Sequence, residues 1–198
     1  MKKPANNDYP INELSRERWS PRAFSDDPVP ARFIASLLEA ARWAPSAANE
    51  QPWRFIIGMK GDATWDLLYS TLIGWNQQWA DQAPLLLLII GKEKNNSNEK
   101  SNQWYAYDCG QAMAHLTLEV TNLGLYAHQM GGFSAEKAVE LFAIPEGFKP
   151  LAMAAIGYSG NAEKLPEEMK KREVAPRERK ELKELVFSGK FGEPSKII

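Results

Sequence analysis

Six consecutive aliphatic residues, Leu85 to Ile90, constrain the fold of this chain more than any other feature. The run is far too short to cross a bilayer, which takes about 20 apolar residues, and it ends at Gly91. A strand that is apolar at every position, instead of at every second position, suits burial on both of its faces. The run therefore predicts a strand inside a sheet that is covered on both sides.

Helices and strands are both expected around this strand. Apolar residues recur at helical spacing between Pro30 and Pro45, and again from Tyr105 to Leu123, where Gly124 is well placed to end the helix in a left-handed turn. Further helices are expected at 63–72 and at 135–142, with Ser134 as N-cap, and further strands at 53–57, 125–130 and 151–156. No regular βαβ repeat appears, so the sequence predicts an α+β fold in one domain, residues 1–198, with 1–13 as a flexible N-terminal extension.

The composition argues against several classes of protein. Hydrophobic residues make up 44% of the 198 residues and charged residues 25%, and the net charge is −1. This is ordinary globular usage without the broad basic field that binds nucleic acid, so no nucleic-acid partner is expected. The N-terminus has no apolar core, and we expect a cytoplasmic protein without membrane association. The single cysteine, Cys109, excludes an intrachain disulfide and is expected to be buried on a helix.

Motifs for metal, hydrolase and nucleotide sites are missing. The two histidines, His115 and His128, have no cysteine or acidic ligand pattern beside them, so no metal site is expected. The chain has no GxSxG sequence of a serine hydrolase and no GxGxxG or GxxxxGK[ST] loop. No Rossmann domain is therefore expected.

Two segments together predict a phosphorylated cofactor. The helix stopped by Pro45 leads into Ser46-Ala-Ala-Asn-Glu-Gln-Pro-Trp53, a connection of small and polar residues that exposes backbone donors. About twenty residues upstream, Arg18-Trp-Ser-Pro-Arg22 places a guanidinium group on each side of a hydroxyl. Arginine and hydroxyl donors in this combination can hold a phosphate.

Both segments resemble motifs of the FMN-dependent nitroreductases, RxSxR near the N-terminus and APSxxNxQPW after a helix. The resemblance continues through Asp108-Cys-Gly-Gln-Ala112, Gly131-Gly-Phe133 and Ala175-Pro-Arg-Glu-Arg-Lys180, and covers roughly residues 14–194. It implies a nitroreductase-like fold, with a central mixed, mostly antiparallel sheet flanked by helices. It also implies a homodimer in which the C-terminal arm, residues 160–198, is swapped onto the partner subunit.

The resemblance implies FMN as the cofactor and gives roles to named positions. Arginines and a hydroxyl are expected to hold the phosphate, and the loop after Pro45 is expected to lie against the flavin of the partner subunit. An asparagine, whose alternative is a simple turn residue, is expected at the flavin carbonyl edge, and a glycine pair at flavin N5, where glycine permits close contact. The expected cofactor-binding residues are Arg18, Trp19, Ser20, Arg22, Pro45, Ser46, Ala47, Asn49, Gln51, Asn76, Gly131, Gly132, Arg177 and Arg179.

A polar loop and an aromatic cluster are expected near the substrate. Residues 92–102 contain no apolar side chain, so we expect a mobile excursion that cannot pack and that could serve as a lid. Trp104, Tyr105 and Tyr107 follow it, where the family places aromatic residues that roof the substrate. The alternative for each aromatic residue is packing in a core or interface.

The resemblance implies a ping-pong, two-electron reductase. NAD(P)H would give hydride to FMN and leave, and an electron-poor small molecule, such as a nitroaromatic or a quinone, would then be reduced. No side chain need be catalytic, because the cofactor carries the chemistry. Other branches of the family, a dehalogenase or ring oxidase among them, stay open. So do a non-enzymatic flavin-binding or flavin-storage protein and a Trp-rich interaction module without cofactor.

Overall fold

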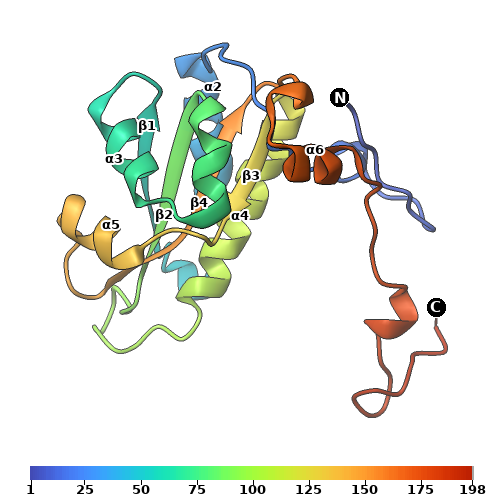
Figure 1. Cartoon of the computed structure of the whole chain (residues 1–198). Helices are drawn as coiled ribbons and strands as arrows, with labels where there is room; N and C mark the ends of the chain where they lie inside the picture. Colours follow the sequence, from blue (N-terminus) through green and yellow to red (C-terminus); the bar gives the residue numbers. More distant parts are fainter. Residues whose placement is uncertain (198) are drawn as a thin grey trace.

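A four-stranded antiparallel sheet forms the centre of the structure, a computed structural model that describes residues 1–197 (Figure 1). The strand order is β1-β2-β4-β3, and every neighbouring pair is antiparallel. The strands are β1 (Trp53–Met59), β2 (Leu85–Lys92), β3 (Tyr126–Met130) and β4 (Phe148–Gly157). The aliphatic run is thus an inner strand, as predicted, and the fold is α+β.

Side chains of β2 alternate between two hydrophobic layers. Leu86, Leu88 and Ile90 join the layer formed with α3 (Ala63–Thr71) and α5 (Ala135–Leu141). Leu85, Leu87 and Ile89 join the layer formed with α2 (Ala31–Arg42) and α4 (Tyr105–Asn122). None of these six side chains is more than 4% exposed. Helices therefore cover both faces of the sheet, and this explains why the strand has no polar position.

Local signals set most of the element boundaries. The Ser134 hydroxyl accepts the Lys137 N–H at the start of α5, and Gly124 adopts a φ of +73° just after α4, both as predicted. The expected start of β4 at residue 151 is wrong, because the strand begins at Phe148 and includes Pro150. A register shift between Ile89 and Ile90 lies beside this proline. Such an irregularity lets an inner strand tolerate a residue without an N–H.

The short elements lie in the connections and near the termini. No helix of the described residues 1–197 has both the length and the apolarity needed to cross a membrane. Lys3 Nζ donates to the Glu173 carbonyl and the Ala5 N–H to the Arg16 carbonyl, both at 2.7 Å. Part of the expected N-terminal extension is therefore held by specific contacts. The short elements are α1 (Glu13–Glu17), η1 (Ala47–Asn49), η2 (Gly74–Gln78), η3 (Ala80–Gln82), η4 (Ala162–Lys164), α6 (Glu167–Val174) and η5 (Leu182–Glu184).

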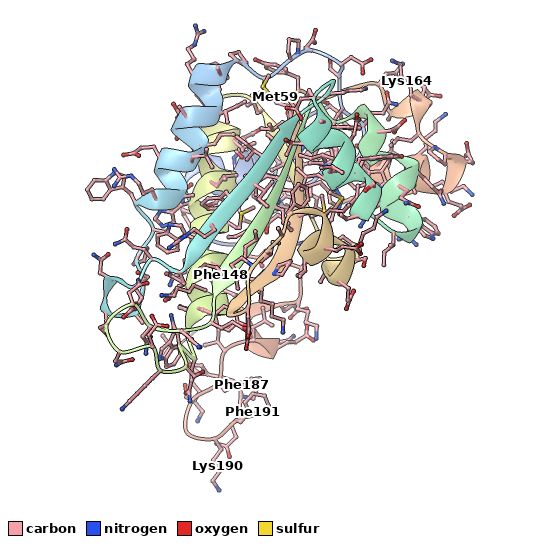
Figure 2. All side chains as sticks on the ribbon, turned by 90° about the vertical axis from the view of Figure 1, so that its left-hand side faces the viewer. Met59, Phe148, Lys164, Phe187, Lys190 and Phe191 are labelled. Atoms are coloured by element: carbon pink, nitrogen blue, oxygen red, sulfur yellow. The ribbon has the colours of Figure 1, made fainter. Side chains whose placement is uncertain are left out.

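The C-terminal arm after α6 runs away from the body of the molecule (Figure 1). Leu185 is 56% exposed and Phe191 is 95% exposed. The rings of Phe187 and Phe191 lie 4.9 Å apart at the far end of the arm, where Figure 2 labels both residues. The arm thus presents apolar side chains to solvent in the single chain, and its swap onto a partner stays a prediction.

The polar loop of residues 92–102 packs against the body, so the expectation that it cannot pack is wrong. Buried Glu50 accepts the Asn96 N–H at 2.5 Å, and the Asn96 side chain donates to the Glu50 carbonyl at 2.7 Å. Asn102 is only 3% exposed, and its N–H donates to the Glu93 carbonyl at 2.8 Å. Hydrogen bonds, and not apolar contacts, therefore hold this loop against the body.

Candidate functional site

Three arginines gather at one surface hollow of about 420 Å³. Arg18 follows α1 directly, whereas Arg177 and Arg179 come from the arm about 160 residues later. The N-terminal segment around Asn6 and Asp8 forms another part of the lining. The structure therefore brings together the two arginine-rich segments that the sequence analysis assigned to one phosphate.

The arginines of this hollow have hydrogen-bond partners but no ion-pair partner within the described part of the chain. Arg18 donates to the Ser20 hydroxyl at 3.2 Å, and Arg177 donates to the Lys3 and Arg16 carbonyls at 2.7 and 3.0 Å. Burial lowers the pKa of Arg18, and the neighbouring charges of Arg177 and Arg179 lower it further. Like charges held this close favour binding of an anion, which would relieve their repulsion. The donor set fits a phosphate group.

Trp19 belongs to the core more than to this hollow. Its side chain is only 5% exposed and packs edge-on against Tyr126, with ring centroids 6.0 Å apart. Lys3 Nζ lies 4.9 Å from the ring centroid on the N-terminal side. The Trp19 ring therefore packs in the interior, next to the segment that carries Arg18 and Ser20, and its expected contact with the cofactor stays a prediction.

Arg22 lies in a separate cluster at the other end of the same segment. Its backbone N–H donates to the buried Glu173 carboxylate, and its Nη1 lies 4.0 Å from Glu173 Oε2. Burial lowers the pKa of Arg22, while Glu173 opposes this and Arg172 adds to it. His128 Nδ1 lies 2.9 Å from the Pro21 carbonyl. The sequence analysis missed Glu173 and Arg172, because nothing local distinguishes them within a highly charged tail.

Asn76 and Gly132 contact each other, as their expected shared role requires. Asn76 Nδ2 donates to the Gly132 carbonyl at 3.1 Å. A Cβ atom on Gly132 would come within 2.7 Å of Asn76 Nδ2, so any larger residue would displace the Asn76 side chain from this contact. Arg172, on the same helix as Glu173, lies 4.8 Å from the ring centroid of Trp75. Helix α6 therefore connects the Arg22 cluster with the segment that carries Asn76.

The loop after Pro45 lies at the start of α4. The Ala47 N–H donates to the Asp108 carboxylate at 3.1 Å, and the Gln51 N–H donates to the Ser46 hydroxyl at 3.0 Å. Asn49 and Gln51 have positive φ values of +55° and +46°, unusual for residues other than glycine. The loop is thus held in a specific conformation by hydrogen bonds within the loop and to α4.

The loop after Pro45 contacts the start of α4 through Asp108, whereas Arg18 directly follows α1, which lies beside the other end of α4. Asn122, at the end of the helix, borders a depression that α1 also lines, and Arg18 follows α1. The 14 residues from Asp108 to Asn122 correspond to about 20 Å of helix. The loop and the arginines of one chain are therefore well separated along α4.

Of the three aromatic residues expected at the substrate, two are exposed. Trp104 and Tyr107 are 59% and 65% exposed and lie edge to face, with centroids 6.4 Å apart. Tyr105 differs, because its ring fills the space beside Gly91, where a Cβ atom would approach it to 2.5 Å. Tyr105 is therefore half-buried and packed on one side, and all three aromatic residues stay predicted substrate contacts.

Nucleophile and metal chemistry find no support in the described residues. Cys109 is 1% exposed, and burial, followed by the charge of Asp108, raises the pKa of its thiol to about 12. It is a buried core residue, as predicted. Within residues 1–197, no group of three or more His, Cys, Asp or Glu side chains is arranged to hold a metal ion.

Comparisons of the sequence with a family model and with individual proteins find clear similarities. The family model described as the nitroreductase family matches residues 15–64 and 66–158. An uncharacterized 15.4 kDa protein of Mycolicibacterium smegmatis is 34% identical over 71% of this chain and 99% of its own length. A protein of Thermus thermophilus named NADH dehydrogenase is 27% identical over 72% of this chain and 83% of its own.

Among solved structures, one described as an oxidoreductase containing FMN superposes with a TM-score of 0.90. It is 38% identical in sequence, and the match covers 95% of this chain and 96% of that chain. The matched family segments contain Arg18, the loop after Pro45, Asn76 and Gly132, so they include most of the geometry described above. This chain belongs to the nitroreductase family, whose members are flavin-dependent oxidoreductases.

Proposed function

We propose that the protein is an FMN-dependent NAD(P)H oxidoreductase that reduces an electron-poor small molecule in two-electron, ping-pong turnover. The observation that carries this proposal is the hollow where Arg18, Arg177 and Arg179 meet without an acidic ion-pair partner in the described residues. Such a donor set fits the FMN phosphate. The solved oxidoreductase that contains FMN, at 38% identity, supports the same cofactor.

Further residues would orient the cofactor. Arg22 would face the pyrimidine end of the flavin, Asn76 its carbonyl edge, and the backbone of Gly132 would approach N5. Bound FMN supplies hydride acceptance and delivery at N5, so the side chains need only bind, orient and exclude water. Neither the Gly131 nor the Gly132 N–H donates to a backbone carbonyl in the described residues, which leaves both free to donate to a ligand.

We further propose that the working unit is a homodimer in which each FMN site uses two chains. The separation of the loop after Pro45 from the arginine hollow supports this arrangement. The outer edge of β1 has no strand partner in the described chain, and an apolar hollow of about 290 Å³ beside it is lined by Ile56, Phe142 and Phe148. The exposed apolar side chains of the arm suit that surface on a partner.

The acceptor we propose is a planar nitroaromatic or quinone. Trp104 and Tyr107 of one subunit would then cover the flavin of the other, together with the loop after Pro45, because both lie at the same end of α4. Aromatic side chains stack favourably on planar ligands. We place the protein in the cytoplasm, where nicotinamide nucleotides are supplied by metabolism.

Visible spectroscopy of the purified protein tests this proposal. We expect a yellow protein after reconstitution with FMN, and rapid bleaching of the flavin band when NADH or NADPH is mixed in without oxygen. Addition of a quinone should then restore the band. A protein that stays colourless with FMN would contradict the cofactor assignment, and bound flavin that neither nucleotide bleaches would indicate a storage protein.

A further inference from the structure

Glu173 is a buried carboxylate that contacts the backbone of the segment carrying Arg22. Its side chain is only 2% exposed. Oε1 accepts the N–H groups of Arg22 and Ala23 at 2.9 and 3.1 Å, and Oε2 accepts the Arg22 N–H at 3.0 Å. Burial of a carboxylate is costly unless it is paired and hydrogen-bonded, and both conditions are met here.

These hydrogen bonds fix a segment that has no regular secondary structure. Residues 18–23 form neither helix nor strand, so their backbone donors need partners elsewhere. Glu173 satisfies two of them, and His128 holds the Pro21 carbonyl at 2.9 Å. The positions of Ser20 and Arg22 therefore depend on a helix about 150 residues away in the sequence.

The same carboxylate also faces the Arg22 guanidinium. Nη1 of Arg22 lies 4.0 Å from Oε2 of Glu173, and the Arg22 side chain is 25% exposed. The guanidinium of Arg172 lies 4.8 Å from the ring centroid of Trp75 and adds a positive charge without touching the carboxylate in the described contacts. The carboxylate of Glu173 thus partly neutralises the positive charge of the Arg22 guanidinium.

We propose that Glu173 is a positioning residue that fixes the backbone of residues 18–23 and reduces the positive charge that Arg22 presents to the cofactor. This inference rests on the proposed function, in which Arg22 faces the flavin. Reduced FMN carries more negative charge on its ring than oxidised FMN. Glu173 therefore weakens the binding of reduced FMN relative to oxidised FMN, and so tunes how readily the bound flavin gives up its electrons.

The test measures dissociation constants for oxidised and for reduced FMN in the full-length protein and in Glu173→Gln. Glutamine keeps an acceptor for the backbone N–H groups but removes the charge. The ratio of the two constants, oxidised over reduced, should rise about three- to tenfold, as expected for a nearby partly screened charge. A tenfold change corresponds to a potential shift of about +30 mV for a two-electron couple.

A matched control and a double-mutant cycle separate this effect from a general one. Glu168→Gln removes the same charge from an exposed position of the same helix and should leave the ratio within twofold of wild type. In an Arg22→Gln background, Glu173→Gln should change the ratio less than it does in the wild-type background, because part of its effect acts through the position of Arg22.

Several results would overturn the inference. Equal weakening of oxidised and reduced FMN in Glu173→Gln, with a lower melting temperature of the apoprotein, would show a structural role only. If Glu173→Gln does not fold, Glu173→Asp carries the test: its shorter side chain draws the charge away from Arg22 and should raise the ratio about twofold, and an unchanged ratio would refute the proposal. Wild-type protein that binds no FMN would overturn the proposed function first, and this inference with it.

Discussion

His128 shows at the residue scale how surroundings decide the behaviour of a side chain. The residue lies on β3, and its ring centroid is 4.7 Å from that of Trp79. Burial lowers its pKa to about 4, and the positive charge of Arg22 contributes in the same direction. The imidazole is therefore neutral near pH 7, and its Nδ1–H donates a hydrogen bond to the Pro21 carbonyl.

This environment predicts how stability depends on pH. An unfolded histidine titrates near 6.5, so between about pH 6.5 and 4 the unfolded chain binds a proton that the folded chain does not. The free energy of unfolding should therefore fall as the pH falls through this window, by about 2 kcal/mol from this residue. Urea unfolding at pH 7 and pH 4.5 measures it. His128→Gln should remove the pH dependence that His128 contributes to the free energy of unfolding, whereas His115→Gln, at an exposed position, should keep it. Equal pH dependence of the two variants would show that His128 is not its source.

At the scale of elements, one glutamate links the polar loop of residues 92–102 to the loop after Pro45. Glu50 accepts the Asn96 N–H at 2.5 Å and lies 3.4 Å from the Ser97 hydroxyl. Its neighbours Asn49 and Gln51 both have positive φ. The two loops therefore hold one conformation together.

Removal of this carboxylate should release the polar loop without unfolding the core. Glu50→Ala removes the charged acceptor of the Asn96 N–H and of the Ser97 hydroxyl, and hydrogen bonds to a charged group contribute about 1.5 to 3 kcal/mol. Local opening should then become about tenfold more frequent, and limited trypsin digestion should cut faster after Lys94 and Lys100. Glu99→Ala, at an exposed position of the same loop, is the control. Equal cleavage rates in wild type and Glu50→Ala would show that Glu50 does not hold the loop.

The elements were predictable where the signal is local. Periodicity located the principal helices and strands, and Ser134 and Gly124 marked their ends. The packing of residues 92–102 was not predictable, because it depends on hydrogen bonds to a side chain more than 40 residues away. The predicted start of β4 was wrong for a related reason, because the strand tolerates Pro150 only through a register shift with neighbouring β2.

The candidate site was predictable only in part. The motif resemblance assigned Arg18, Arg177, Asn76 and Gly132 to one cofactor, and the structure brings Arg18 close to Arg177 and Asn76 close to Gly132. Trp19 is buried and Tyr105 is half-buried beside Gly91, packing that the motif did not indicate, and the expected roles of both residues stay predictions. Glu173 had no local signal, because its role follows from tertiary contacts.

At the scale of the whole molecule, the part of the arm that follows Glu181 exposes apolar side chains in the described chain. Leu182, Leu185 and Phe191 are at least 40% exposed. A chain ending at Glu181 should lose the dimer and the flavin together, while the body keeps its fold, because these apolar side chains do not pack on it. Light scattering measures the dimer, and the flavin absorbance measures the bound FMN. Lys190→Ala, a full-length chain with one change in the arm, is the control and should keep both. A truncated monomer that retains FMN would contradict the role of the arm.

Subunit complementation tests the two-chain FMN site most directly. Arg18→Ala breaks the phosphate hollow, and the double variant Ser46→Ala, Asn49→Ala breaks the loop after Pro45; each homodimer should bind FMN at least about tenfold more weakly than wild type. In a mixed dimer, one site combines the intact hollow of one chain with the intact loop of the other. Differently tagged subunits, purified together, should therefore bind one FMN per dimer with wild-type affinity and be bleached by the nicotinamide donor. Mixed dimers that bind FMN as weakly as both parents would contradict a site shared between two chains.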